Sequence, residues 1–231
     1  DSVTLSATPT PTPVSNLWSP SEISTLAWYD AADTSTITTS NGGNDVTLMT
    51  DKSSNNFDLS VITNNRIGPN SGTRTFNNLN VLDYDKVSVS TYQILEVNNF
   101  NKSNPVALSM LVHLDDEGVE SDSDWLISFT DASSPRLGLR RTAAGSFQLI
   151  TDGGNIGAAS VMVEPGTFLV TLYFNGATAS ARLQGSFLNS GTVANNTLEI
   201  INLGANYNAV GQLDGFIAET ILYSSNADIT K

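Results

Sequence analysis

Short runs of alternating apolar and polar residues constrain the fold of this chain more than any other feature. Residues 106–114 (VALSMLVHL) and 168–174 (FLVTLYF) carry an apolar residue at every second position. A period of two is typical of a half-buried β-strand. Clusters such as SNGGND and TDGGN separate these runs, and no long amphipathic helix pattern interrupts them. The chain is therefore predicted to be all-β, folded as a two-sheet antiparallel jelly-roll sandwich.

The first sixteen residues, DSVTLSATPTPTPVSN, differ in composition from the rest. Proline fixes an extended backbone, and the segment has too little apolar mass to fold alone. We predict an extended arm or linker over residues 1–16, which clasps another subunit of an assembly, and a single jelly-roll domain over residues 17–231. Ser19 as N-cap and Pro20 as first helical residue predict a short helical turn at the start of that domain.

Charge and composition exclude several classes of partner. The 231 residues include 23 acidic and 10 basic residues, a net charge of −13, which disfavours nucleic acid and anionic membranes. No run of about 18 apolar residues predicts a membrane span. Only 14% of residues are charged, so Ser, Thr, Asn and Gly must build much of the surface. That composition indicates an extracellular or virion-surface protein.

The stretch LAWYDAADTSTI, residues 26–37, places aromatic residues beside carboxylates and permits two interpretations. It could be a sugar-cleaving site, or a strand that runs into a capped turn. We favour the turn, with Trp28 packed in the core or on the sheet and with Asp30 and Asp33 accepting hydrogen bonds from backbone N–H groups.

Four motifs in the same order resemble a known family. They are LWSPSEISTLAWYDAADTSTIT, VTLMTDKSSNNFDLS, NLNVLDYDKVSVSTYQILEV and LGANYNAVGQLDGFIAETILYSS. Together they are similar to the laminin-G-like, concanavalin-A-like jelly rolls of bacterial and phage surface proteins. Met49 stands where the family usually has Trp. The resemblance implies a jelly roll and only weakly implies a function, because this fold hosts lectins, hydrolases, lyases and structural modules.

Catalysis is predicted to be absent. No E-x-D-x-x-E strand supplies the facing carboxylates of a glycoside hydrolase. The single histidine, His113, lacks the accompanying strand motifs of a polysaccharide lyase. A polysaccharide-degrading enzyme of the same fold, or its carbohydrate-binding module, is the alternative.

The acidic loop DDEGVESDSDW offers oxygen ligands of the kind that calcium binds. A calcium site there would use Asp115, Asp116, Asp122 and Asp124. The loop does not have the order of an EF-hand, so a hydrated surface loop is the favoured interpretation, with no cofactor or metal.

The hairpin formed by WLISF and RLGLR can pair in two registers. If Trp125 lies opposite Leu139, Trp125 is buried and the arginines point outward. A slip by one residue places Trp125 beside Arg140 on one face, a plausible sugar platform. The first register buries more apolar area and is favoured. Either way, Arg140 and Arg141 lie near the SDSD segment and predict surface ion pairs.

A glycan-binding site is predicted on the outward parity of residues 168–174. Tyr173 would stack on a sugar ring, and Arg182 and Gln184 on a neighbouring strand would hold its hydroxyls. The favoured function is a non-enzymatic structural or display module with lectin-like capacity, such as a phage capsid decoration, a tail fibre or a cell-surface domain. Its predicted partners are glycans or other subunits of a particle.

Overall fold

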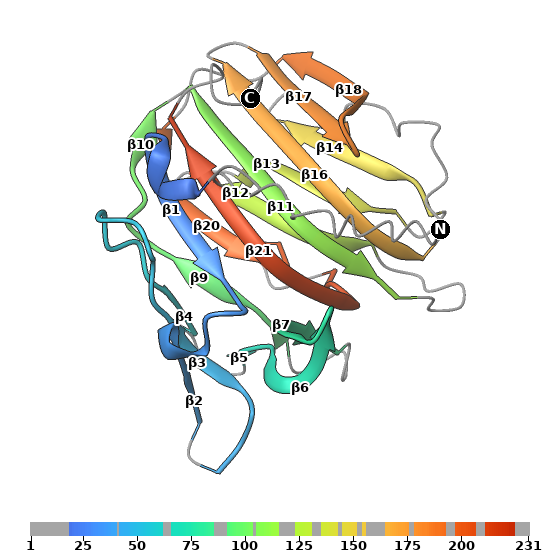
Figure 1. Ribbon diagram of the computed structural model, residues 1–231. Helices are drawn as coiled ribbons and strands as arrows, with labels where there is room; N and C mark the ends of the chain where they lie inside the picture. Colours follow the sequence, from blue (N-terminus) through green and yellow to red (C-terminus); the bar gives the residue numbers. More distant parts are fainter. Residues whose placement is uncertain are drawn as a thin grey trace, which may run out of the picture.

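The computed structural model describes most of the chain between residues 19 and 224 (Figure 1). The described residues are 19–40, 42–61, 66–85, 92–103, 105–115, 123–130, 135–142, 145–151, 154–155, 165–175, 178–192, 197–206 and 211–224. Their only helical elements are two 3-10 turns, η1 (Pro20–Glu22) and η2 (Thr34–Thr36). Ser19 caps η1 as predicted. No helix in the described part of the chain is long and apolar enough to span a membrane.

One antiparallel sheet, called sheet A below, contains the two strands with the clearest alternation, β11 and β16. Its strands, in spatial order, are β18 (Ser186–Thr192), β17 (Thr178–Leu183), β16 (Gly166–Asn175), β11 (Val106–Leu114), β21 (Gly215–Tyr223), β7 (Leu79–Tyr84) and β6 (Asn70–Phe76). A further strand, β1 (Thr25–Asp30), pairs with β21, so the first and last described strands lie side by side in this sheet.

The second antiparallel sheet, sheet B, contains the hairpin whose register the sequence left open. Its strands, in spatial order, are β15 (Gly154–Asn155), β14 (Phe147–Thr151), β13 (Pro135–Arg141), β12 (Asp124–Thr130), β20 (Ile200–Leu203), β9 (Leu95–Val97), β4 (Leu59–Ser60), β3 (Val46–Met49) and β2 (Ile37–Thr39). Two small pairs complete the described strands: β10 (Lys102–Ser103) with β19 (Thr197–Leu198), and β5 (Arg66–Ile67) with β8 (Tyr92–Gln93).

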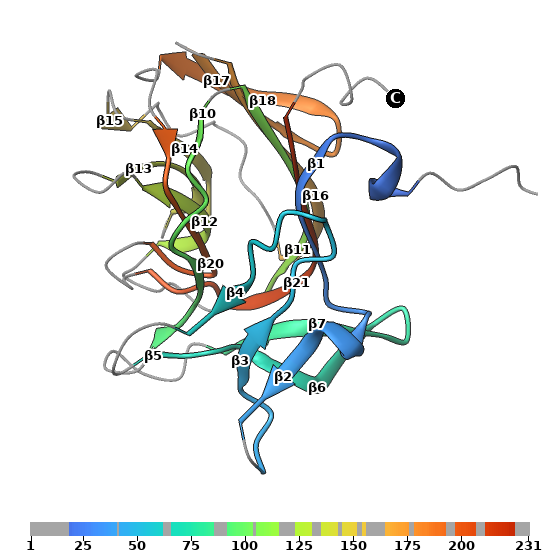
Figure 2. The same cartoon turned by 90° about the vertical axis from the view of Figure 1, so that its left-hand side faces the viewer.

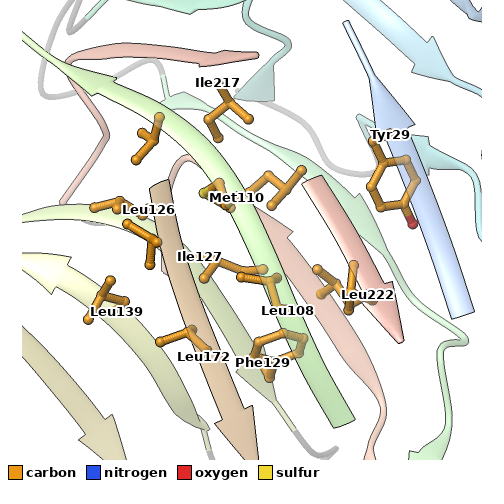
Figure 3. Close-up of a cluster of buried hydrophobic side chains, with 14 of the residues drawn as sticks. Tyr29, Leu108, Met110, Leu126, Ile127, Phe129, Leu139, Leu172, Ile217 and Leu222 are labelled. Atoms are coloured by element: carbon orange, nitrogen blue, oxygen red, sulfur yellow. The ribbon is translucent and has the colours of Figure 1, made fainter. Parts of the chain in front are cut away.

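The two sheets pack face to face around one core. Figure 2 shows β12, β13 and β14 of sheet B on one side of the molecule and β11, β16 and β21 of sheet A on the other. Phe129 of sheet B meets Phe174 of sheet A edge to face, with ring centroids 5.5 Å apart. Leu108, Met110 and Leu172 lie in the same buried cluster (Figure 3). The predicted all-β, two-sheet antiparallel sandwich of jelly-roll type is therefore confirmed.

Candidate functional site

A β-bulge in β12 turns Trp125 away from the core. Trp125 pairs with Arg140, whereas Ile127 pairs with Leu139, so Leu126 is an extra residue on this strand. Leu126 and Ile127 are 0% and 1% exposed and both point into the core (Figure 3). At a bulge, two residues of one strand face a single residue of the partner strand. Beyond the bulge, the inward and outward positions of the strand are therefore exchanged.

The favoured prediction for this hairpin, with Trp125 buried opposite Leu139, is therefore wrong. The alternative that places Trp125 beside Arg140 is the one observed. In a regular strand, a slip by one residue would move the whole apolar set from the core to the outer face. The bulge prevents this exposure of apolar side chains, because Ile127 still pairs with Leu139 and Phe129 still pairs with Leu137, and all four lie in the core.

Three outward side chains of β12, β13 and β14 form a compact group, called the Trp125 platform: Trp125, Arg140 and Gln148. Arg140 Nε and Nη2 donate to Gln148 Oε1 at 2.8 and 2.6 Å. The guanidinium carbon lies 5.5 Å from the centroid of the Trp125 ring. The indole lies against Gly138, where a Cβ would stand 2.9 Å from Trp125 Cζ3. Strand backbones thus hold a half-buried aromatic ring beside a charged hydrogen-bond donor.

The rest of this outer face is nearly closed to solvent and mixes polar residues with Ile150, which pairs with Gly138 and is 6% exposed. Glu96, Asn202, Ser128 and Gly138 form one cross-strand row on it. Ser128 and Asn202 are 2% and 1% exposed, so they are too buried to contact a ligand. Burial raises the pKa of Glu96, and the ion pair with Arg66 (2.9 Å) opposes that effect.

Two residues of the predicted site, Tyr173 and Arg182, lie on the outer face of sheet A. Tyr173 pairs with Ser180, and Arg182 pairs with Thr171 one step along the same outward row. Arg182 is exposed and donates to the carbonyl of Gly185 at 3.1 Å. The placement of Tyr173 and Arg182 on one face is confirmed. Gln184 was predicted on the strand of Arg182, but the hairpin turns there: Gln184 lies between β17 and β18 with a φ of 50°, and its Nε2 donates to the carbonyl of Thr167 at 3.2 Å. The role of these residues in binding stays a prediction.

Two details of this predicted site were not anticipated. Tyr173 is half-buried against a small outer cluster that includes Ile221 and Tyr223, so much of its ring is committed to packing. Phe187, which pairs with Arg182, is 60% exposed. The sequence indicated this exposed ring only through a single aromatic residue in the polar strand SFLNSGT. Gln148 was also missed, although it alternates with the apolar residues of SFQLI.

The LAWYDAADTSTI segment has the structural role that was favoured. Asp30 accepts a hydrogen bond from Ala32 N–H at 3.0 Å, and Asp33 caps η2. Lys52 bridges Asp30 and Asp33 at 2.8 and 2.9 Å. Trp28 packs on the outer face of sheet A and not in the main core, with its indole N–H donating to Glu219 at 2.8 Å.

The acidic loop contributes two described carboxylates, and each faces an arginine. Asp115 accepts from Arg74 Nη2 at 2.7 Å, and Asp124 pairs with Arg141 Nη2 at 2.6 Å. Asp116 and Asp122 lie outside the described residues. No group of three metal-binding side chains occurs within the described ranges, and calcium binding at this loop stays a prediction. The Asp124–Arg141 pair is buried, which corrects the prediction of a surface ion pair there.

His113 forms a cluster of its own on the outer face of sheet A. Its ring stacks on Phe216 with centroids 4.8 Å apart, Nδ1 lies 2.8 Å from Thr167 Oγ1, and Nε2 lies 3.2 Å from Asp115 Oδ1. Burial lowers the pKa of His113, and the Asp115 carboxylate opposes this shift. The histidine is held by packing on an aromatic ring.

The lowered pKa predicts a stability change with pH. Between the unfolded pKa of about 6.5 and the lower folded pKa, the unfolded chain binds more protons, so acidification through this range should reduce the free energy of unfolding. Urea denaturation at pH 7.5 and 5 should show a larger loss for the native protein than for His113→Gln. Equal losses in both proteins would contradict the assignment, since the carboxyl groups titrate in both.

The fold defines the chain as an all-β antiparallel sandwich of jelly-roll type. The sequence matches no family model and no curated protein. Among similar solved structures is the Trypanosoma rangeli sialidase in complex with 2,3-difluoro-KDN, at 13% identity and a TM-score of 0.59, covering 87% of this chain and 30% of that chain. The present chain thus spans less than a third of the sialidase.

Two further structures have similar scores. The binding domain of botulinum neurotoxin serotype D/C has 12% identity and a TM-score of 0.58, covering 91% of this chain and 51% of that chain. Domain 4 of AbnA, an extracellular GH43 arabinanase from Geobacillus stearothermophilus, in complex with arabinotriose, has 14% identity and a TM-score of 0.57, covering 87% of this chain and 92% of that chain. At these identities the similarity establishes the fold.

Proposed function

We propose that the chain is a non-catalytic glycan-binding module that binds sugar through the Trp125 platform. The observation that carries the proposal is the β-bulge that turns Trp125 out of the core beside Arg140 and Gln148. A bulge that re-aims a side chain is typical of functional sites. An aromatic ring with a few fixed polar groups is also the composition of a small-molecule site.

The distribution of carboxylates supports a non-catalytic role. On the outward positions of β12, β13, β14, β20 and β9, the described side chains include one carboxylate, Glu96, which is ion-paired with Arg66. Hydrolysis of a glycosidic bond usually needs two facing carboxyl groups. The proposal is therefore binding without cleavage.

The similar structures support a sugar ligand for this module. The arabinanase domain is described in complex with arabinotriose, and cell entry of botulinum neurotoxin type C is described as dependent on two ganglioside molecules. The resemblance to laminin-G-like surface proteins and the neutral polar composition support display on a cell or virion surface. A role as a capsid decoration or tail fibre, with residues 1–16 joining an assembly, belongs to the same proposal; that segment lies outside the described residues.

Replacing Trp125 by alanine tests the platform. Loss of a stacked ring is expected to weaken binding by about fivefold or more, because stacking on an aromatic side chain contributes roughly 1–3 kcal/mol. The measurement is a glycan array followed by affinity electrophoresis in gels that contain the bound polysaccharide. Phe187→Ala is the matched control, since it removes an exposed aromatic from sheet A near the Tyr173 site.

The paired variants separate the two candidate surfaces. If Phe187→Ala or Tyr173→Ala abolishes retention and Trp125→Ala does not, sugar binding belongs to sheet A and the platform is wrong. If no glycan is retained by the native protein, a structural role replaces binding. Steady release of reducing ends from a polysaccharide, above a boiled control, would establish the enzymatic alternative.

A further inference from the structure

Arg140 differs from the other partly buried arginines in its partner. Arg66, Arg74 and Arg141 each lie against a carboxylate, at 2.9, 2.5 and 2.6 Å. Within the described part of the chain, Arg140 donates only to the neutral carboxamide of Gln148. Burial without a counter-charge is unfavourable for a cation and lowers the pKa of Arg140. Although the chain has a net charge of −13, none of its described carboxylates pairs with this arginine.

The geometry leaves one edge of the Arg140 guanidinium available. The group has five N–H donors, and Gln148 Oε1 takes those on the Nε and Nη2 side. The opposite edge, formed by Nη1 and the second Nη2 hydrogen, meets no acceptor among the described residues. Such an edge matches a carboxylate, which it binds through two parallel hydrogen bonds.

The same guanidinium lies over the Trp125 ring, which is the proposed stacking surface. Its central carbon is 5.5 Å from the Trp125 ring centroid. An acidic sugar carries its carboxylate directly on a ring carbon. A sugar ring that stacks on the indole can therefore present this group to Arg140.

We infer that the Trp125 platform selects acidic sugars, whose carboxylate pairs with the free edge of Arg140. This inference rests on the proposed function of the platform and names its ligand class. The bound carboxylate supplies a counter-charge that the described residues do not provide. The net charge of −13 repels polyanions from the rest of the surface, so retention of an acidic polymer has to come from a local site.

The test compares acidic polysaccharides with their own neutral forms. Polygalacturonate, alginate and polysialate are each used with the carboxyl-reduced polymer, which keeps the backbone and loses the charge. The native protein should bind an acidic form about tenfold or more tightly than its reduced form, the usual scale for a charge-assisted hydrogen bond. Arg140→Gln should remove that preference, so that the acidic and the reduced polymer bind with similar affinity.

Two further variants keep the result interpretable. Arg140→Lys keeps the charge but loses the planar fork, so it should recover only part of the preference. Lys102→Gln removes one positive charge outside both candidate sites and should have no effect. Thermal unfolding of each variant checks that it is folded.

Each other outcome overturns the inference. Equal binding of acidic and reduced polymers, with loss of both in Trp125→Ala, rejects the acidic ligand and leaves the platform standing. Tighter binding of a sulfated galactan than of any carboxylated polymer, lost in Arg140→Gln, replaces the carboxylate by a sulfate ester. Failure to bind any polymer rejects both the ligand class and the proposed function.

Discussion

Replacing Asp124 by alanine is expected to lower the free energy of unfolding by about 3–5 kcal/mol, the usual cost of breaking a buried ion pair. Asp124 is 5% exposed, and its Oδ2 accepts from Arg141 Nε at 2.7 Å. Arg141 Nη1 also donates to the carbonyl of Asp115 at the end of β11, so this arginine ties sheet B to sheet A. Without Asp124 the guanidinium keeps its burial and loses its counter-charge. Urea denaturation measures the loss.

A double variant serves as the control for Asp124. Asp124→Leu combined with Arg141→Met removes both charges and keeps apolar volume, so most of the lost stability should return. A cost below about 1 kcal/mol for Asp124→Ala alone would show that the pair behaves like an exposed one. The interpretation that a buried ion pair stabilises the contact between the two sheets would then be wrong.

Replacing Gly204 by alanine is expected to lower the free energy of unfolding by about 2–5 kcal/mol, because backbone strain and overpacking act together. Gly204 has a φ of +81°, which L side chains rarely adopt. An added Cβ would also stand 2.0 Å from Cε1 of Tyr84, whose ring is fully buried in the core. The ring has no room to retreat. The measurement is again the free energy of unfolding in urea.

Gly72→Ala separates strain from collision. Gly72 has the same φ of +81°, but nothing lies within 4 Å of an added Cβ. It should cost only the backbone strain, about 1–2 kcal/mol. The difference between the two variants measures the contact with Tyr84. If Gly204→Ala and Gly72→Ala lose the same stability, the Tyr84 ring moves aside without cost, and packing does not require glycine at position 204.

The fold was predictable because its signals are local. Strands β11 and β16 alternate apolar and polar residues, and the structure places Leu108 and Leu172 inward and Tyr173 outward as that alternation requires. The Ser19–Pro20 pattern correctly predicted the start of η1, and Asp33 caps η2. Each of these depends on neighbours along the chain, which the sequence displays directly.

The candidate sites were less predictable, because they join residues distant in sequence. Arg182 was correctly placed on the face of Tyr173, since a short hairpin connects their strands. The packing of Tyr173 beside Ile221 and Tyr223 could not be seen, because β21 reaches this face from the far end of the chain. The exposure of Phe187 likewise depends on its position in β18, an edge strand of sheet A.

The amino-acid sequence by itself determined the all-β class, the turns and the inward or outward direction of side chains within each regular strand. These follow from the backbone, since successive residues of a strand point to opposite faces. Only the tertiary structure decided the direction of Trp125. Its direction depends on a bulge, and a bulge is set by the pairing of β12 with β13 and β20 and by the burial of Leu126 in the core between the sheets. That non-local choice places an aromatic ring beside Arg140 and creates the candidate site.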